Sequence, residues 1–312
     1  MFELILLIFG LAGLVLGSQL IIRGSLDIAK HYKFSQIFIG LTILAIGTDL
    51  PELVVDITGA IHRLQGIETS GLIVGETIGT CFGQIALTMG ILGLFTYLTF
   101  ARRRVIRDGS MMIVSVILLL LVGLDGTITR FDGALFILIY IVYFAYLQRE
   151  EKTFEKIKRA PSMHMMWSAI SVIAGFAILI YCSSLVVENG VKLAEIWGVR
   201  QSLIGIVLLG IGTSLPEIVL SISALIKRAP MLSVGNLIGS NIFDVLFTLG
   251  IGATISEFVV SKNLLIFDIP FLIVTSFIVI IFFLRKRGIQ KIEAGALLAI
   301  YCLYIATKLL GF

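Results

Sequence analysis

Charged side chains are scarce in this sequence. Only 14% of its 312 residues are Asp, Glu, Lys or Arg, whereas 58% are hydrophobic, and the mean hydropathy is +1.07. A soluble domain carries about 25% charged residues, so this composition excludes a soluble enzyme. Apolar runs long enough to cross a bilayer, about 20 residues each, recur along the whole chain. We therefore predict an integral membrane protein that is not an enzyme.

Cysteine and histidine are also few, at three residues each. Cys81, Cys182 and Cys302 lie within apolar runs at unrelated spacings, so we expect packing residues rather than a disulfide framework or a metal site. The longest loop, Gln148–Met165, has mixed charge and no apolar pattern of its own, so no soluble domain is expected. A Walker-type GxxxxGK[ST] sequence is absent, which argues against an ATP-driven pump.

Apolar runs between charged or Gly/Pro-containing breaks predict ten transmembrane helices. The fold class is therefore all-α, integral to the membrane. The expected spans are 2–22, 36–60, 71–98, 110–124, 133–147, 166–187, 202–226, 233–256, 264–284 and 292–311.

The Lys and Arg residues predict the orientation of these spans. Of 24, 18 fall in the loops after spans one, three, five, seven and nine, and 6 fall on the other side. Because cytoplasmic loops retain positive charge, both termini are predicted to be extracytoplasmic, in the cell membrane. Basic residues in short loops serve topology and lipid headgroups. The expected partner is membrane lipid, with no nucleic acid and no evident protein partner.

Two motifs occur twice. Gly40–Glu52 (GLTILAIGTDLPE) matches Gly205–Glu217 (GIVLLGIGTSLPE) at an offset of 165 residues, and Gly75–Thr80 (GETIGT) matches Gly235–Ser240 (GNLIGS) at an offset of 160. Two matches in the same order indicate a duplication.

Each copy contains five spans. An odd number inverts the second copy relative to the first, about an axis in the membrane plane, and inverted repeats are typical of transporters. We predict a first five-helix repeat at 1–150, a cytoplasmic linker at 151–165 and a second, inverted five-helix repeat at 166–312.

The repeated spans contain acidic residues but no Lys, Arg or His. An ionised side chain at mid-bilayer costs roughly 2.5–3.5 kcal/mol, so six would cost about 15–20 kcal/mol if unpaired. Bound protons or bound cations must neutralise them, and both alternatives describe a cation site. The six acidic residues are Asp49, Glu52, Asp56, Glu76, Glu217 and Asp244.

The prolines of the motifs predict broken helices. Pro51 and Pro216 lack the N–H that would bond the carbonyl four residues earlier, so the carbonyls of Gly47 and Gly212 are expected to be free for other partners. Polar residues four apart share a helix face. Such sets are Thr48 with Glu52, Thr213 with Glu217, Glu76 with Thr80 and Gln84, and Asn236 with Ser240 and Asp244. These oxygen ligands suit Ca²⁺ and Na⁺, and the lack of His argues against zinc or copper.

Other residues of these spans are interpreted as structural. Thr88 and Thr248 are expected to bond back to their own helices. Asp268 has no counterpart in the other repeat, and a helix-start or packing role is expected ahead of ion handling. Glycines at four-residue spacing let helices approach closely. These packing glycines are Gly75, Gly79, Gly83, Gly235 and Gly239.

The paired GTxLPE and GxxIG[ST] motifs, in two five-helix halves facing opposite ways, resemble the cation/calcium exchanger superfamily, especially its prokaryotic sodium/calcium exchanger branch. The resemblance covers the whole chain, and Gly212–Glu217 (GTSLPE) and Gly235–Asp244 (GNLIGSNIFD) match closely. It implies a core of spans two, three, seven and eight, with spans one and six as outer helices that slide against it. Motif side chains and nearby carbonyls would hold the ions. The implied ligands are Ala45, Thr48, Asp49, Glu52, Thr80, Gln84, Gly210, Thr213, Ser214, Glu217, Ser240 and Asp244.

The first repeat departs from the family pattern. Asp49 stands where Ser is usual, Asp56 where the second repeat has Ser221, and Glu76 where Asn is expected. Glu76 therefore joins the candidate ligands. The longer Gln84 fills an amide position. More negative charge favours divalent ions or protons over Na⁺.

The predicted function is a secondary antiporter that exchanges Ca²⁺ for Na⁺ by alternating access, with no cofactor besides the transported ions. The alternative is exchange of Ca²⁺ or another divalent cation for H⁺, motivated by the additional acids. A passive cation channel, a non-transporting cation sensor and an intramembrane aspartyl protease are further alternatives. Such a protease would need a GxGD sequence, which is absent.

Overall fold

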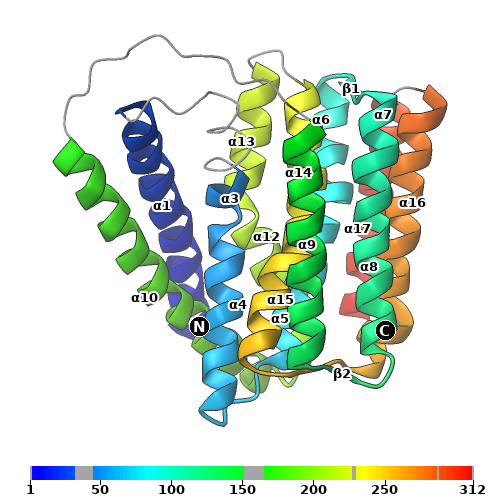
Figure 1. Ribbon diagram of the computed structural model, residues 1–312. Coiled ribbons are helices and arrows are strands. Elements are labelled where there is room, and N and C mark those ends of the chain that lie inside the picture. Colours follow the sequence, from blue (N-terminus) through cyan, green and yellow to red (C-terminus); the bar gives the residue numbers. More distant parts are fainter. Residues whose placement is uncertain (1, 32–44, 151–164, 227–229, 287, 311–312) are drawn as a thin grey trace.

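The computed structural model describes residues 2–31, 45–150, 165–226, 230–286 and 288–310, and nearly all of these are helical (Figure 1). Helices suit apolar segments because they satisfy every backbone hydrogen bond internally. Up to residue 150 the helices are α1 (Phe2–His31), α3 (Ala45–Thr48), α4 (Leu50–Leu64), α5 (Ser70–Phe82), η2 (Gly83–Thr88), α6 (Met89–Phe95), α7 (Arg102–Arg104), η3 (Val105–Gly109), α8 (Ser110–Gly123) and α9 (Arg130–Glu150).

The second part of the chain repeats this succession, again with π-helical turns (η) inside longer helices. Its helices are α10 (Met165–Trp197), α11 (Gln201–Ile204), η4 (Gly205–Leu209), α12 (Gly210–Thr213), α13 (Leu215–Ile226), α14 (Pro230–Phe243), η5 (Asp244–Thr248), α15 (Leu249–Ile255), η6 (Leu264–Asp268), α16 (Ile269–Lys286) and α17 (Lys291–Leu309). The predicted third and eighth spans thus each contain a π-helical turn, η2 and η5, at the same place in the motif.

Among the described residues, nine helical stretches are long and apolar enough to cross a membrane. The helices α3 and α4 form the end of the predicted second span, whose beginning lies outside the described residues, as does 151–164 of the predicted linker. The prediction of a helical membrane protein is confirmed. The described exceptions are four two-residue strands, β1 (Leu98–Thr99), β2 (Thr127–Ile128), β3 (Phe258–Val259) and β4 (Gly288–Ile289).

Four spans are longer than predicted by several residues. The first continues to His31 instead of residue 22, the fourth begins at Arg102 instead of residue 110, the fifth covers Arg130–Glu150, and the sixth continues to Trp197. In each case the hydropathy pattern ends at a charged residue while the helix does not. Long Arg and Glu side chains at helix ends reach the membrane interface, so their charge does not terminate the helix.

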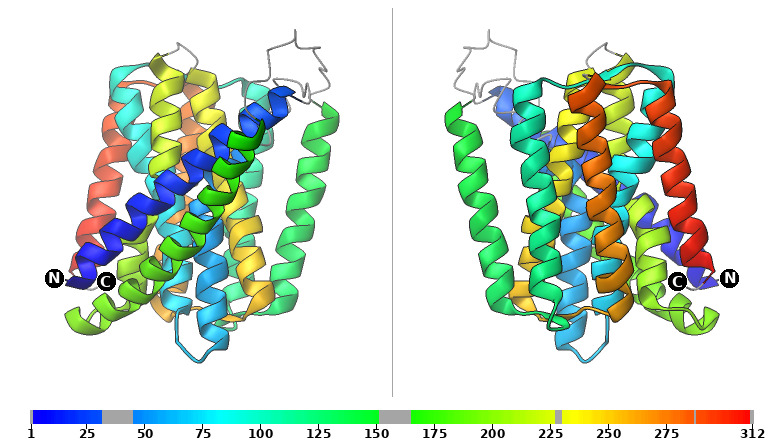
Figure 2. Two further views of the ribbon diagram at one scale, coloured as in Figure 1. Left: turned by 90° about the vertical axis from the view of Figure 1, so that its left-hand side faces the viewer. Right: turned by 90° about the vertical axis from the view of Figure 1, so that its right-hand side faces the viewer.

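The strands pair at the two ends of the molecule. The antiparallel pair β1–β4 lies at one end and the pair β2–β3 at the other (Figure 1). The loop carrying β1 follows the predicted third span, and the loop carrying β3 follows its counterpart, the eighth. Equivalent loops at opposite ends are what two inverted halves require. The helix α1 begins, and the helix α17 ends, at the β2–β3 end (Figure 2).

The helices α1 and α10 pack side by side on the outside of the bundle and run obliquely across it (Figure 2). A Cβ on Gly17 would lie 2.9 Å from the Gly175 carbonyl oxygen, and a Cβ on Gly175 would lie 2.7 Å from the Gly17 carbonyl oxygen. The close crossing therefore requires glycine on both helices. Their place outside the core agrees with the family resemblance.

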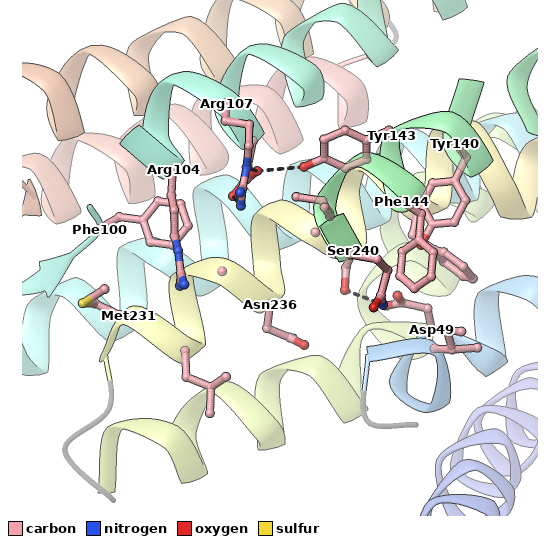
Figure 3. Close-up of a pocket in the computed structure, with 18 residues that line it drawn as sticks. Asp49, Phe100, Arg104, Arg107, Tyr140, Tyr143, Phe144, Met231, Asn236 and Ser240 are labelled. Carbon is pink, nitrogen blue, oxygen red and sulfur yellow. Dashed lines mark hydrogen bonds and ion pairs between the residues drawn. The ribbon is translucent and has the colours of Figure 1, made fainter. Parts of the chain in front are cut away.

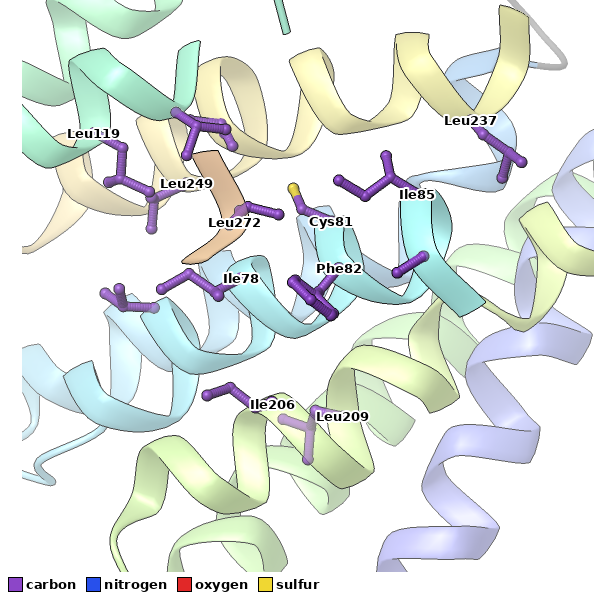
Figure 4. Packing of buried hydrophobic residues seen from close by; sticks show 14 of the residues in the cluster. Ile78, Cys81, Phe82, Ile85, Leu119, Ile206, Leu209, Leu237, Leu249 and Leu272 are labelled. Atoms are coloured by element: carbon purple, nitrogen blue, oxygen red, sulfur yellow. The ribbon is translucent and has the colours of Figure 1, made fainter. Parts of the chain in front are cut away.

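The hydrophobic core centres on α5 and η2 (Figure 4). Ile78 and Phe82 are fully buried between η4, which contributes Ile206, and the helices α15 and α16. Outer helices expose large apolar side chains, as Phe131 does on α9, and these suit a lipid surface. The packing role expected of the cysteines holds for Cys81 and Cys182, which are buried, but is wrong for Cys302, which is exposed on α17.

Candidate cation site

Both motif helices are interrupted next to their prolines, as predicted. Asp49 (φ −83°, ψ 7°) separates α3 from α4, and Ser214 (φ −72°, ψ 2°) separates α12 from α13. The proline is the second residue of the following helix in both cases. The Gly212 carbonyl accepts the Ser214 N–H, so the expectation that it is free is wrong: the break lets the chain form this tighter bond.

Six carboxyl groups lie together near these breaks. None of the six residues is more than 2% exposed. In the described part of the chain, none of them forms an ion pair. Each experiences the negative charge of at least one other, for example Glu217 that of Glu52 and Asp49. The members of this carboxylate cluster are Asp49, Glu52, Asp56, Glu76, Glu217 and Asp244.

Hydroxyl groups join the predicted set of Glu76, Thr80 and Gln84 to the second motif. Thr213 donates to Glu76 Oε1 at 2.9 Å, and Thr80 lies 3.4 Å from the same oxygen. Thr80 also lies 3.4 Å from the Thr213 hydroxyl and 3.3 Å from the Gly210 carbonyl oxygen, which accepts the Ser214 hydroxyl at 2.7 Å. The structure therefore brings residues from both repeats into one oxygen-rich group.

Amide groups connect the helix that carries Glu76, Thr80 and Gln84 with the helix that carries Asn236, Ser240 and Asp244. Gln84 Nε2 lies 3.4 Å from Asp244 Oδ2, and Asn241 Nδ2 donates to Gln84 Oε1 at 2.6 Å. Asn241 was not among the predicted site residues. Its neighbour Ser240 was, and the GSN sequence around both is the signal that would have found it.

The remaining predicted ligands lie close to the first break. Ser240 donates to Asp49 Oδ1 at 2.6 Å and so joins α14 to the start of α4. Thr48 is buried at the end of α3, and Ala45 begins that helix. Asp49 lies beside Glu217, which belongs to the second motif. The predicted site residues thus converge from α3, α4, α5, α12, α13 and α14 with the turns η2 and η5.

Several carboxylate oxygens of the cluster are unsatisfied. Within the described residues, both oxygens of Glu52, Asp56 and Glu217 lack a hydrogen-bond partner, as do Glu76 Oε2 and Asp244 Oδ1. A buried, unpaired carboxylate is strongly unfavourable. These atoms are therefore free to bind a cation or a proton.

A cavity of about 200 Å³ leads from the β1–β4 end to Asp49 and Ser240 (Figure 3). Asn236 lines its interior, while Arg104 and Arg107 lie further out. Of the six carboxylates of the cluster, Asp49 alone lines this cavity, so the cavity reaches the edge of the cluster from one end of the molecule.

The motif glycines differ between the two repeats. A Cβ on Gly79 would lie 2.4 Å from the Ile206 carbonyl oxygen, and one on Gly75 would lie 2.7 Å from that of Ser202, so packing is confirmed for both. Nothing lies within 4 Å of the corresponding position at Gly239, which borders the cavity with Gly235. The packing prediction is therefore wrong for Gly239, and also for Gly83, which has no close neighbour either. A Cβ on Gly235 would lie 3.5 Å from the Phe100 ring, so this glycine faces a side chain instead of a neighbouring helix.

The structural roles predicted for Thr248 and Asp268 agree with the structure, and the one predicted for Thr88 does not. Thr248 donates to the Asp244 carbonyl at 2.7 Å, as expected, but Thr88 Oγ1 is without a partner among the described residues. Asp268 accepts bonds from Tyr304 (2.7 Å) and Lys308 (2.9 Å) away from the cluster, which agrees with its predicted packing role.

Comparisons with known proteins agree with this geometry. Residues 2–148 and 167–310 match the protein family described as Sodium/calcium exchanger protein. Sodium/calcium exchanger MaX1 of Methanosarcina acetivorans is 27% identical over 96% of this chain and 97% of its own. Inner membrane protein YrbG of Escherichia coli is 26% identical over 78% and 77%. The structure of the sodium-calcium exchanger NCX_Mj, soaked with Na⁺ and Sr²⁺, is similar with a TM-score of 0.67, at 26% identity and 97% coverage of both chains.

Proposed function

This chain belongs to the sodium/calcium exchanger family, and from that premise we propose that it moves Ca²⁺ across the membrane in exchange for Na⁺. It is a multi-pass membrane protein and a cation antiporter; the identity of the two ions and the mechanism are the proposed part. Both ions would bind at the central glutamates Glu52 and Glu217 in turn, with access alternating between the two sides and no ATP consumed.

The burial of six carboxylates without a basic partner among the described residues carries this proposal. Neutralisation has to come from the transported cations, because each uncompensated charge would cost roughly 2.5–3.5 kcal/mol in the membrane. Protein oxygens surround the cluster, which favours hard cations such as Ca²⁺ and Na⁺.

Glu52 and Glu217 are the central candidates for Ca²⁺. They come from equivalent positions of the two motifs, and their four oxygens lack hydrogen-bond partners among the described residues. No group of three or more His, Cys, Asp and Glu side chains in the described chain has the close spacing of a metal site. Calcium takes six to eight oxygens, so hydroxyls such as Thr213 and carbonyls such as Gly210 would have to complete the set.

Exchange of Ca²⁺ for H⁺ is the second candidate. The observation that favours it is the additional acid at three buried positions, Asp49, Asp56 and Glu76, where the second repeat has neutral residues. A buried carboxylate binds a proton readily, because burial disfavours its charged form.

Purified protein in liposomes separates these candidates. We expect Ca²⁺ uptake when a Na⁺ gradient is imposed at constant pH, and none when a pH gradient is imposed without Na⁺. Empty liposomes and the Glu217→Gln variant are the controls for leakage. Uptake that follows only the pH gradient would replace Na⁺ by H⁺ as the coupling ion, and no uptake under either gradient would refute calcium exchange.

A further inference from the structure

Asp56 is a buried carboxylate that the resemblance does not assign to the ion site. It is 0% exposed, and neither of its oxygens has a hydrogen-bond partner in the described chain. It lies on α4 one turn beyond Glu52, further along the chain from Asp49, and does not line the cavity that reaches Asp49. With a rise of about 1.5 Å per residue, Asp56 is displaced by roughly 6 Å from Glu52 along the helix.

The groups facing Asp56 supply further oxygens. The helix α4 packs against η5 and α15, and Thr248 of η5 lies beside the Asp56 carboxyl, with Glu76 close enough to repel it electrostatically. Glu76 Oε2 has no partner within the described residues. By contrast, Glu217 interacts with Glu52 and Asp49. Glu76 also acts on Glu52, and Asp56 acts on Asp244, so Asp56 adjoins the site around Glu52 and Glu217 and shares Glu76 with it.

We propose that Asp56, Thr248 and Glu76 form a separate position for one Na⁺ next to the calcium site. This inference rests on the proposed exchange of Ca²⁺ for Na⁺. The position provides one complete carboxylate, the lone pairs of a hydroxyl that donates its hydrogen to the Asp244 carbonyl, and one oxygen of Glu76. Calcium takes six to eight oxygens, which is more than this group offers. Glu76 already accepts a hydrogen bond from Thr213, whereas no described residue bonds to the Asp56 carboxylate, and a monovalent ion balances the charge of Asp56.

The second repeat provides a natural comparison. The counterparts of Asp56 and Thr248, at the repeat offsets of 165 and 160, are Ser221 and Thr88. Both are buried, and within the described residues both hydroxyls lack a partner. This pair is neutral, so it cannot balance a cation. The additional Na⁺ is expected in one half of the molecule only.

Equilibrium dialysis with radioactive Na⁺ on the full-length protein in detergent tests this position. The Asp56→Asn variant, which keeps size and removes charge, is expected to bind one Na⁺ fewer than the unmodified protein while it still binds Ca²⁺. The Thr248→Val variant keeps the charge and is expected to weaken binding of that Na⁺ by about tenfold. Ser221→Ala is the matched control and should bind as many Na⁺ as the unmodified protein.

An unchanged number of bound Na⁺ in Asp56→Asn would overturn the assignment. So would a loss of Ca²⁺ binding in the folded variant, because Asp56 would then belong to the calcium site. If Asp56→Asn does not fold, the test is Thr248→Val, and unchanged Na⁺ affinity in that variant contradicts the proposal. Failure of the proposed function has a different signature: the unmodified protein would show no Na⁺-driven Ca²⁺ uptake, whatever number of Na⁺ it binds.

Discussion

Individual carboxylates of the cluster differ in how far the protein itself stabilises them. Asp49 accepts a hydrogen bond from Ser240, and Glu76 accepts one from Thr213. Glu52 and Glu217 accept none from the described residues. The two central glutamates therefore depend most on the bound ion, because an unpaired buried carboxylate is the least favourable state for them.

We expect Glu52→Gln and Glu217→Gln each to abolish Ca²⁺-dependent transport without unfolding the protein. Each substitution keeps the side-chain volume and removes one of the charges that balance Ca²⁺. Flux into liposomes measures transport, and thermal unfolding with and without Ca²⁺ measures binding, since a ligand bound only to the native state raises its stability. Substantial exchange by Glu217→Gln would mean that the central site lies elsewhere.

Asp268 and Lys308 form a buried ion pair with a structural role. Their charged atoms are 2.9 Å apart, the side chains are 0% and 3% exposed, and Tyr304 holds the other oxygen of Asp268. We expect Lys308→Met to lower the free energy of unfolding by about 3–5 kcal/mol, because it leaves a buried charge without its partner. Thermal unfolding in detergent measures the change.

The double variant Asp268→Asn with Lys308→Met is the control for this pair. It should recover part of the stability, because neither residue then leaves an unpaired charge in the interior. A double variant less stable than Lys308→Met alone would contradict the interpretation that unpaired charge causes the loss.

The motif helices pack differently in the two repeats. Gly79 brings α5 against the backbone of η4, whereas Gly239 of α14 borders the open cavity. The helix α5 is packed closely at its motif glycine, whereas α14 is not. The two halves therefore differ in conformation although their motifs are similar. A difference of this kind is what the proposed alternating access requires.

We expect Gly79→Ala to destabilise the protein by about 1–3 kcal/mol, because the new Cβ would lie 2.4 Å from the Ile206 carbonyl oxygen and neither backbone can yield easily. Gly295→Ala in α17 is the matched control. No atom lies within 4 Å of its Cβ position, and alanine in a helix is favoured over glycine by about 0.5–1 kcal/mol. Thermal unfolding compares the two, and equal stability of both variants would argue against the close contact.

The cavity that reaches Asp49 lies at one end of the molecule. The cavity opens at the β1–β4 end, near the basic residues Arg104 and Arg107. The distribution of Lys and Arg predicts that this end is cytoplasmic. This orientation places the mouth of the cavity that reaches Asp49 on the cytoplasmic side.

Labelling of single cysteines tests this orientation. In a variant without Cys81, Cys182 and Cys302, Glu257→Cys at the β2–β3 end should react with a membrane-impermeant maleimide on intact cells. Arg103→Cys at the other end should react only after permeabilisation. Both positions are exposed, so access to the reagent depends on the side of the membrane. The opposite pattern would place the cavity mouth and the termini on the reverse sides.

The sequence by itself determined the helical membrane architecture, the interrupted motif helices and the candidate residues for the proposed cation site. Apolar runs of bilayer length leave the backbone no alternative to helices. Pro51 and Pro216 remove the same N–H from both motifs, and acids without basic neighbours in the same spans, such as Glu52 and Glu217, require a cation or a proton. These features depend on local composition and on spacing along a single helix, which a sequence displays directly.

Contacts between distant segments were decided by the tertiary structure alone. Asp49 lies 191 residues from its partner Ser240, and Thr213 lies 137 residues from Glu76. Gly79 and Gly239 occupy equivalent positions of the repeated motif, yet Gly79 is packed against another helix and Gly239 borders a cavity. The physical reason is that helix packing depends on how whole elements tilt and approach, and similar motifs are compatible with both the closed and the open arrangement.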